Sequence, residues 1–406
     1  MKVYTGIDWS ENKHDIVFMN QAGASVGRFT IPHTPAGFLR LVSECEALGV
    51  ERAECVIGLE TAHNLFIDFL WAQNYTQVYV IPPSVVKSNR GRHGSSGART
   101  DQSDAYLLAD ILRTDRNRLQ LWHPDGLLTR QIRAKSSYIA HLTRNIVRTS
   151  NRLRAVLLRY HPAVLHVFSS MRARIRLRFL CAYPTPQATR ELTFAEFTTF
   201  AAQYGYKRPA KLRAYYAELQ GVHPTPAAET VQIYQQEAVQ LATSLLGLLD
   251  IKYTATRELG HLFAQHPDAF IFESLPGAGE LLAPGLLAKF GDDRRRFSQA
   301  ASVQALAGTC PVTKSSGKRK VIHFRRACDR EFRDLAQKWA VASLSQSAWA
   351  NAYWHDVRPH CRSSSHAYRC LANRWLAIAW KMWQTKTAYD ETYHMQQRAK
   401  HSRPRR

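Results

Sequence analysis

The chain has 406 residues, which is long enough for two or three domains with sizeable hydrophobic cores. Its hydrophobic content of 45% indicates a globular protein, and 55 Lys and Arg residues against 32 Asp and Glu residues give a formal charge of +23. Such an excess repels itself unless a partner neutralises it. It therefore favours binding of a polyanion over an inert basic surface or a membrane-binding surface.

The seven cysteines indicate neither a disulfide framework nor a zinc module, because their number is odd and no C-x-x-C pair occurs. We expect them to be reduced thiols in a cytosol. The first residues lead directly into a strand, and no apolar run approaches transmembrane length. The sequence therefore predicts a soluble, cytoplasmic protein with no membrane partner.

The first 81 residues alternate between apolar runs typical of strands and segments of helical periodicity. The predicted elements are strands at Val3–Trp9, His14–Met19 and Ser25–Ile31, a helix at Thr34–Ala47, a strand at Cys55–Leu59, a helix at Ala62–Ala72 and a strand at Val78–Ile81. With the helix that follows, the order is β-β-β-α-β-α-β-α. It predicts a sheet that begins with hairpins and ends with crossovers.

Two acidic residues fall at the ends of predicted strands. Asp8 lies near the end of the first strand and Glu60 follows the fourth. If these strands are neighbours, the two carboxylates face each other at one edge of the sheet. A single acid at the end of a strand is more often a cap or turn residue. The pair therefore indicates a metal site only if further acids lie nearby.

Two further acids precede an apolar helical run, Asp104–Arg113. Asp101 and Asp104 lie three residues apart, on one helix face, after the basic, glycine-rich segment Asn89–Gly97. Four clustered carboxylates would raise one another's pKa unless cations occupied the site, and Mg²⁺ is the ion suited to oxygen ligands and substrate phosphate. The predicted phosphate contacts beside these acids are Arg90, Arg92 and Arg99.

Leu127–Arg159 predicts a long helix with a coiled-coil-like seam, because apolar residues recur every seven positions from Ile132 to Tyr160. It contains eight basic residues and no acid, whereas a solvated face normally mixes both signs. We expect this face to lie against nucleic acid or an acidic protein surface. The candidate contacts are Arg144, Arg148 and Arg152.

Ala227–Phe263 predicts a second long helix that could pair antiparallel with the first as an arm, a natural place for subunit contacts. The intervening segment, Ala163–Gly221, is less informative. It contains helical pieces with several aromatic residues, for which packing is favoured over stacking on bases.

The last part of the chain starts near Pro267. Gly277 and Gly279 precede the helical run Leu281–Phe290, and their backbone amides would suit a DNA phosphate, although a purely structural turn has the same composition. Tryptophans of the terminal helices are expected in the core. They are Trp339, Trp349, Trp354, Trp375, Trp380 and Trp383.

A basic loop with two adjacent serines follows at Val312–Lys320. Lys314, Lys318 and Arg319 could hold a phosphate near Ser315 and Ser316 and stabilise charge that develops during attack on it. Taken alone, the segment is typical of a flexible linker.

The predicted parts of the chain are residues 1–125, a helical arm at 126–265, a C-terminal domain at 266–396 and a basic tail at 397–406.

Together these segments resemble the DEDD-type insertion-sequence transposases, which are bridge-RNA-guided serine recombinases. The motifs that resemble the family's RuvC-like domain are Gly6–Ser10, Gly58–Thr61 and Arg99–Ala105. Those that resemble its C-terminal transposase domain are Leu275–Gly279, Ala307–Pro311 and Ser315–Gly317. The ordered set spans both ends of the chain and is more specific than any one motif.

The resemblance implies an α/β domain with an RNase H/RuvC-like mixed sheet, followed by an all-α coiled-coil arm and a helical transposase domain. It implies Mg²⁺ held by Asp8, Glu60, Asp101 and Asp104 and a nucleophilic serine, which we assign to Ser316 with Ser315 in reserve. It further implies a structured guide RNA that pairs with donor and target DNA, a dimer that assembles to a tetramer, and active sites shared between subunits. Such a protein would work at the bacterial nucleoid.

The sequence departs from the family pattern in three places. Ala62 stands where the family has glycine after Glu-x-Thr, Ala327–Asp329 replaces a small-glycine turn, and the segment at 163–221 is longer than expected. Two other functions stay open. One is a metal-dependent junction nuclease or DDE-like transposase without a serine nucleophile, and the other is a non-catalytic nucleic-acid-binding scaffold.

Overall fold

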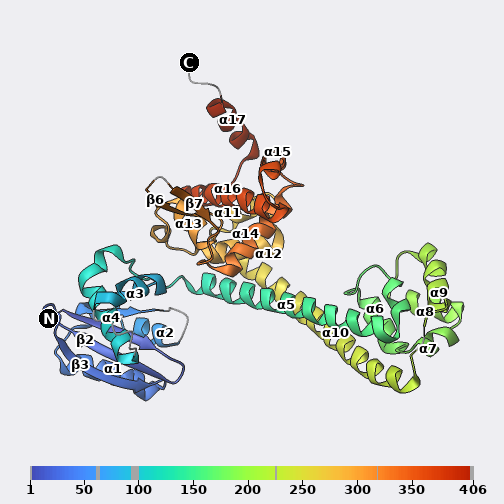
Figure 1. Cartoon of the computed structure of the whole chain (residues 1–406), viewed down its shortest axis with the longest axis horizontal. Helices are drawn as coiled ribbons and strands as arrows, with labels where there is room; N and C mark the ends of the chain where they lie inside the picture. The colour runs from blue at the N-terminus through green and yellow to red at the C-terminus, as the bar shows by residue number, and fades with distance from the viewer. Residues whose placement is uncertain (1, 61–64, 93–99, 225, 318, 403–406) are drawn as a thin grey trace. The chain divides into compact units, whose positions relative to one another are not determined.

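The computed structural model describes residues 2–60, 65–92, 100–224, 226–317 and 319–402. The chain divides into two compact units, Met1–Pro124 and Asp125–Arg406, drawn in blue to cyan and in green to red in Figure 1. The first contains a five-stranded sheet with helices, and the second is mostly helical. No helix among the described residues is long and apolar enough to cross a membrane.

The sheet of the first unit is mixed. Its strands are β1 Val3–Trp9, β2 Lys13–Met19, β3 Ser25–Pro32, β4 Cys55–Leu59 and β5 Val78–Val80. The spatial order is β3-β2-β1-β4-β5, in which β1, β2 and β3 are antiparallel neighbours and β4 and β5 run parallel to β1. This confirms the predicted RuvC-like mixed sheet, with hairpins first and crossovers last.

Helices cover both faces of this sheet. They are α1 Pro35–Ala47, α2 Leu65–Ala72, α3 Pro83–Asn89 and α4 Asp101–Asp115. Side chains alternate along each strand, so Val3 and Ile7 of β1 pack in one core cluster with α1 and α2, while Tyr4 packs in another with α4. The sheet is therefore buried on both faces, as its apolar strands require.

Two glycines allow helix α4 to lie very close to the centre of the sheet. A Cβ atom on Gly6 of β1 would lie 1.9 Å from the carbonyl oxygen of Ala105, and one on Gly58 of β4 would lie 2.6 Å from Leu112. The first contact is with helix backbone, which cannot move away as a flexible side chain can. The close approach brings the start of α4 to the strands that carry the acidic residues.

An antiparallel pair of long helices, α5 Leu127–Tyr160 and α10 Ala228–Ala264, forms the arm of the second unit (Figure 1). Lys135 near the start of α5 binds Glu258 near the end of α10 at 2.5 Å, and Arg152 farther along α5 binds Glu237 at 2.6 Å. The predicted antiparallel pairing is thus confirmed. Arg133 of α5 likewise binds Asp125, so basic residues along α5 are neutralised by acids of the same unit.

Short helices fill the segment between the two arm helices: α6 Arg174–Ala182, α7 Pro186–Glu191, α8 Phe194–Gln203 and α9 Leu212–Gln220. Their aromatic side chains pack on one another. Phe179 and Phe197 are fully buried, with ring centroids 5.7 Å apart, and Phe168 contacts both. Packing rather than an exposed stacking surface accounts for these residues, as expected.

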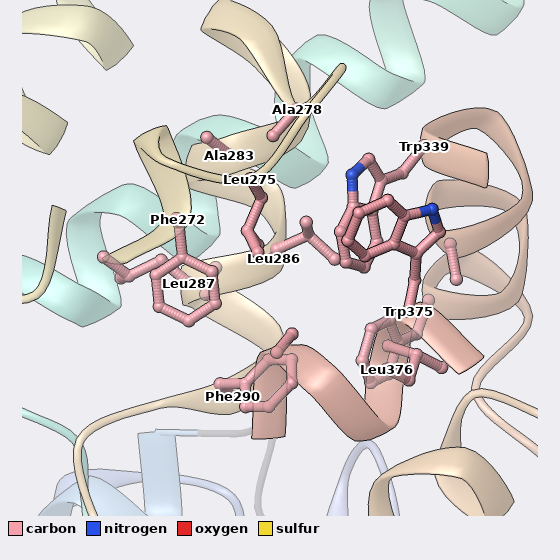
Figure 2. Packing of buried hydrophobic residues seen from close by; sticks show 14 of the residues in the cluster. Phe272, Leu275, Ala278, Ala283, Leu286, Leu287, Phe290, Trp339, Trp375 and Leu376 are labelled. Atoms are coloured by element: carbon pink, nitrogen blue, oxygen red, sulfur yellow. The ribbon is translucent and has the colours of Figure 1, made fainter. Parts of the chain in front are cut away.

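The rest of the second unit is a helical domain with one hairpin. Its elements are α11 Ala269–Glu273, α12 Gly279–Phe290, α13 Ala300–Leu306, β6 Val312–Ser316, β7 Arg319–His323, α14 Arg330–Ser343, α15 Ala348–Val357, α16 Ser364–Thr385 and α17 Glu391–Ser402. Figure 2 shows Trp339 and Trp375 side by side in its core, with ring centroids 5.1 Å apart. Both are fully buried, as is Trp383, and Trp349 is also buried, which confirms the predicted core role for these four. Trp354 and Trp380 are partly buried and pack against the same core.

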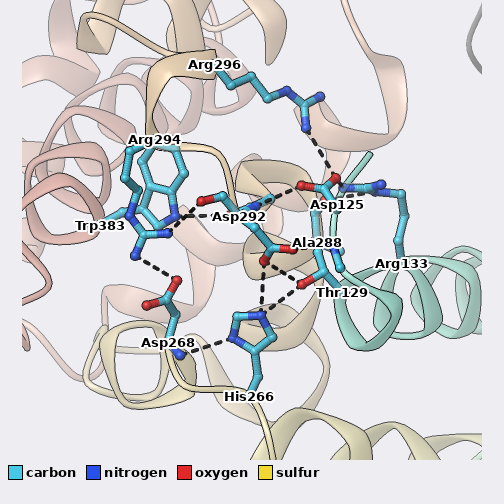
Figure 3. Close-up of polar contacts among 12 residues, drawn as sticks. Asp125, Thr129, Arg133, His266, Asp268, Ala288, Asp292, Arg294, Arg296 and Trp383 are labelled. Atoms are coloured by element: carbon cyan, nitrogen blue, oxygen red, sulfur yellow. Dashed lines mark hydrogen bonds and ion pairs between the residues drawn. The ribbon is translucent and has the colours of Figure 1, made fainter. Parts of the chain in front are cut away.

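A partly buried polar network joins the start of α5 to the ends of α10 and α12 (Figure 3). The Asp292 carboxylate accepts hydrogen bonds from Thr129 Oγ1 at 2.6 Å and from the Gly126 N–H at 2.7 Å, and His266 Nε2 lies 3.2 Å away. Burial alone would raise the pKa of Asp292. The hydrogen bonds outweigh burial and lower its pKa from 3.8 to about 2.

We expect Gly6→Ala to lower the free energy of unfolding by about 1–3 kcal/mol or more, because the new methyl group collides with the backbone of α4. Urea denaturation of the full chain measures the change. Gly91→Ala is the matched control, since a Cβ there meets nothing within 4 Å. Equal stability of wild type and Gly6→Ala would contradict the close approach.

The depressed pKa of Asp292 means that its ionised form stabilises the folded state above about pH 4, and that this stability is lost as the pH falls through about 2. Asp292→Asn should therefore melt below wild type at neutral pH, and the two melting temperatures should converge toward pH 2. Asp334→Asn, which removes an exposed ion pair with Lys338 on α14, should change the melting temperature little at any pH.

Candidate active site

The register of the sheet places two of the four predicted acids at one edge. Strands β1 and β4 are parallel, and Ile7 is paired with Leu59 in the ladder. The next residue of each strand is acidic, so Asp8 and Glu60 emerge side by side where the paired strands end. Their closeness follows from strand order alone.

The other two acids occupy the first turn of α4. Thr100 caps this helix, accepting from the N–H of Ser103 at 3.1 Å, and the Ser103 hydroxyl accepts in return from the N–H of Thr100 at 3.1 Å. The helix therefore begins at Asp101, three residues before the predicted run. Asp101 and Asp104 lie in its first turn, at the positive end of the helix dipole.

The four carboxylates share one electrostatic environment. Burial raises the pKa of Asp8 to about 7, and the charges of Asp104, Asp101 and Glu60 add to the increase. Burial also raises the pKa of Glu60, followed by the charge of Asp104. The structure thus brings Asp8, Glu60, Asp101 and Asp104 together from two strands and a helix that lie far apart in the sequence.

Two basic side chains balance the acids at this edge. Lys13 Nζ lies 2.9 Å from Asp101, and the Arg90 guanidinium lies 3.2 Å from Asp104. Lys13 was not predicted as part of the site, and its place opposite the end of β1 follows from the β1–β2 hairpin. Its signal was a lysine at the start of a strand that pairs with an acid-bearing strand.

The donor set fits a hard divalent cation. All four side chains offer carboxylate oxygens, and burial together with their mutual repulsion makes an added positive charge favourable. Among the described residues, no three of these acids place one oxygen each within 4.8 Å of the others. To bind an ion jointly, Asp101 and Asp104 would exchange their contacts with Lys13 and Arg90 for metal contacts.

The serines of the C-terminal region lie on a β-hairpin rather than in the predicted loop. Strands β6 and β7 pair antiparallel, with Ser316 opposite Arg319 and Ser315 opposite Lys320, and Gly317 begins the turn with a positive φ of 54°. A two-residue separation that contains glycine is a hairpin signal. The hairpin was not predicted, because the composition of the segment is typical of a flexible linker.

The hairpin separates the two serines onto opposite faces, because successive side chains of a strand alternate. Ser316 shares its face with Lys314, two residues earlier, and with Arg319 directly across. Ser315 shares the other face with Thr313 and Lys320. Both serines are exposed, and neither Lys314 nor Arg319 takes part in an ion pair within the described part of the chain.

The remaining predicted nucleic-acid contacts differ in their surroundings. Arg92 is bound by Asp115 at 2.7 Å and Arg152 by Glu237, whereas Arg144 and Arg148 are exposed on α5. Arg99 and Lys318 lie outside the described residues.

The two glycines before α12 also differ. Gly277 is buried, its N–H donates to Gln346 Oε1 at 2.8 Å, and a Cβ atom there would lie 2.5 Å from the backbone nitrogen of Ser343. Its amide is therefore used inside the domain, and the turn it forms has a structural role. Gly279 is exposed at the first position of α12.

Comparison with known proteins matches both ends of the chain. A DEDD-type IS110 model described as a transposase matches residues 5–162, and a model described as the IS116/IS110/IS902 transposase family matches residues 269–355. The first contains all four acids of the sheet edge, and the second contains the serine hairpin.

Similar proteins span nearly the whole chain. The mini-circle IS117 protein of Streptomyces coelicolor, whose name describes a transposase, is 30% identical over 404 residues, which is 96% of each chain. The 44.8 kDa protein of insertion element IS116 from Streptomyces clavuligerus is 27% identical over 399 residues, again 96% of each chain. The 42 kDa protein of insertion element IS900 from Mycobacterium paratuberculosis is 25% identical, over 95% of this chain and 97% of its own.

The raised pKa of Asp8 means that its ionisation opposes folding as the pH rises from about 4 through 7. Without divalent cations, Asp8→Asn should therefore melt above wild type at about pH 8, by about 4 °C for each 1 kcal/mol gained. The difference should shrink as the pH falls toward 4. Glu44→Gln, an exposed position paired with Arg40, should show no such trend. A constant difference at all pH values would contradict the raised pKa.

Proposed function

Because the chain belongs to the IS110/IS116/IS902 family of insertion-sequence transposases, we propose that it is an RNA-guided recombinase that cuts and rejoins DNA through a phosphoserine intermediate on Ser316. The observation that carries this proposal is the position of Ser316 on an exposed strand face between Lys314 and Arg319. Two cations beside a hydroxyl suit the binding of a phosphodiester and the stabilisation of charge on it.

In this mechanism the Ser316 Oγ attacks a DNA phosphorus atom, and the bond from phosphorus to the 3′ oxygen breaks. The serine hydroxyl loses a proton, and the departing 3′ oxygen takes up a proton, so the step is balanced. The phosphate then remains esterified to the protein. A 3′-hydroxyl later attacks the phosphoserine and restores the free serine, so that strands are exchanged without an external energy source.

Asp8, Glu60, Asp101 and Asp104 would hold Mg²⁺, which would neutralise charge on the phosphate oxygens during transfer. Arg90 and Lys13, now bound to Asp104 and Asp101, would be free to contact DNA phosphates once a metal takes their place. The chain contains the acids and the serine more than two hundred residues apart in sequence. We propose that subunits of a tetramer share these groups, as the family resemblance implies.

The proposed nucleic-acid partners are donor and target double-stranded DNA and a structured guide RNA that pairs with both. The formal charge of +23 supports a polyanionic partner, and the exposed Arg144 and Arg148 of α5 and Gly279 at the start of α12 extend the surface for its backbone. Arg92, Arg99, Arg152 and Lys318 complete the proposed set. Such a complex would form in the bacterial cytoplasm at the nucleoid.

A denaturing gel of the full chain incubated with its DNA, its RNA and Mg²⁺ tests the nucleophile. Wild type should give an SDS-stable protein–DNA adduct, and Ser316→Ala should lower its yield by on the order of 10³-fold or more, because no other hydroxyl occupies that position. Ser315→Ala is the matched control, since its side chain lies on the opposite face of the hairpin. It should retain the adduct.

An adduct that survives Ser316→Ala and disappears with Ser315→Ala would overturn the assignment of the serine. Mg²⁺-dependent nicking without any adduct would identify a nuclease or DDE-like transposase instead. Asp104→Ala should abolish both the protein–DNA adduct and the nicked DNA. If wild type binds DNA but does not cleave it, the protein is a nucleic-acid-binding scaffold. Omission of the RNA separates guided from unguided cutting.

A further inference from the structure

Three side chains with metal-binding atoms meet at the start of helix α16. This helix belongs to the C-terminal part of the second unit (Figure 1). One ligand atom each from Cys361, His366 and Cys370 lies within 4.8 Å of the other two. It is the one group of three or more His, Cys, Asp or Glu ligands with this spacing in the part of the chain that the structure describes. No disulfide joins the two cysteines.

The local backbone places these side chains before any ligand binds. His366 and Cys370 are four residues apart on α16 and therefore lie on one helix face. Ser363 caps the helix, and its Oγ accepts from the N–H of His366 at 3.2 Å. Arg358 holds the preceding turn by donating to the carbonyl of Cys361 at 3.3 Å and to Ser364 Oγ at 3.1 Å.

The surroundings of the cluster are basic, because Arg362 and Arg369 act on His366 and Arg369 and Arg374 act on Cys370. A divalent cation held there therefore needs negatively charged ligands, which the two cysteines would supply as thiolates.

We propose that Cys361, His366 and Cys370 bind one Zn²⁺ ion, with water as the fourth ligand. Two sulfurs and one imidazole nitrogen form a donor set for Zn²⁺ rather than for Mg²⁺, which takes oxygen ligands. Binding would release the thiol protons to solvent, and two thiolates would neutralise the ion. The site is separate from the four acids and does not rest on the proposed recombinase chemistry.

No zinc module was predicted from the sequence, because no C-x-x-C pair occurs and the number of cysteines is odd. The ligands instead follow the spacing C-x₄-H-x₃-C, in which a helical i, i+4 pair replaces the usual turn. A structural role follows from the neighbours of the cluster. Arg369, which precedes Cys370, stacks on Phe324 at 4.7 Å, and Phe324 comes directly after strand β7 of the serine hairpin. The metal would thus fix the helix against which the end of the hairpin packs.

Metal analysis of the full chain, purified without chelators and with zinc supplied, tests the site. Wild type should retain about one Zn²⁺ per chain, and Cys361→Ser, His366→Ala and Cys370→Ser should each reduce this to about a tenth or less. Cys181→Ser is the matched control, because it removes a cysteine of α6 that is distant in sequence from the cluster. It should retain the full amount.

Replacement of zinc by Co²⁺ gives a second measurement that does not depend on variant folding. Wild type and Cys181→Ser should show a thiolate-to-cobalt charge-transfer band in the near ultraviolet. A zinc-selective chelator, added with Mg²⁺ in excess, should lower the melting temperature of these two proteins and not that of Cys370→Ser.

Three outcomes would overturn the proposal. They are wild type without stoichiometric metal at saturating Zn²⁺, full metal content in a Cys361→Ser/Cys370→Ser double variant, and a Cys361–Cys370 disulfide in freshly purified, alkylated protein.

Discussion

The arrangement of the first unit depends on the contact between helix α4 and the centre of the sheet. Where Gly6 meets Ala105, the absence of a side chain lets helix backbone rest on strand backbone, which any methyl group would prevent. The acids are attached to the elements that meet there, Asp8 on β1 and Asp101 and Asp104 on α4. A constraint on packing inside the core therefore also fixes the geometry of an electrostatic cluster at its edge.

Local charge balance organises a chain whose overall charge is far from neutral. Like charges lie close together in several places, and at two of them counter-charges come from another element. Lys13 and Arg90 contact the acids of the sheet edge, while Glu237 and Glu258 of α10 contact basic residues of α5. Because these contacts are exposed or only partly buried, each contributes little to stability. They leave the cations and acids available to exchange partners when a more highly charged ligand arrives.

The sequence predicted the elements whose physical cause is local and repeated. Alternating apolar strands, the seven-residue seam that begins at Ile132 and the two long helices all appear with bounds within a few residues of those expected. The closeness of Asp8 and Glu60 was also predictable, because it needs only neighbouring parallel strands. Roles that depend on contacts distant in sequence were not. The sequence predicted a phosphate-binding amide at Gly277. In the structure this N–H donates instead to Gln346, sixty-nine residues later. The serine hairpin was hidden by composition, and the assignment of catalytic roles stays a prediction.

The antiparallel pairing of α5 and α10 means that the chain travels out along one helix and returns along the other to the place where it started. The Asp292 network joins the two ends at that place. Helical turns added in equal number to both helices would therefore move the short helices α6 to α9 outward without disturbing the C-terminal core. The length of the arm can therefore change without a change in the packing of the C-terminal core. Relatives could vary in the length of this segment while they keep the rest of the unit unchanged.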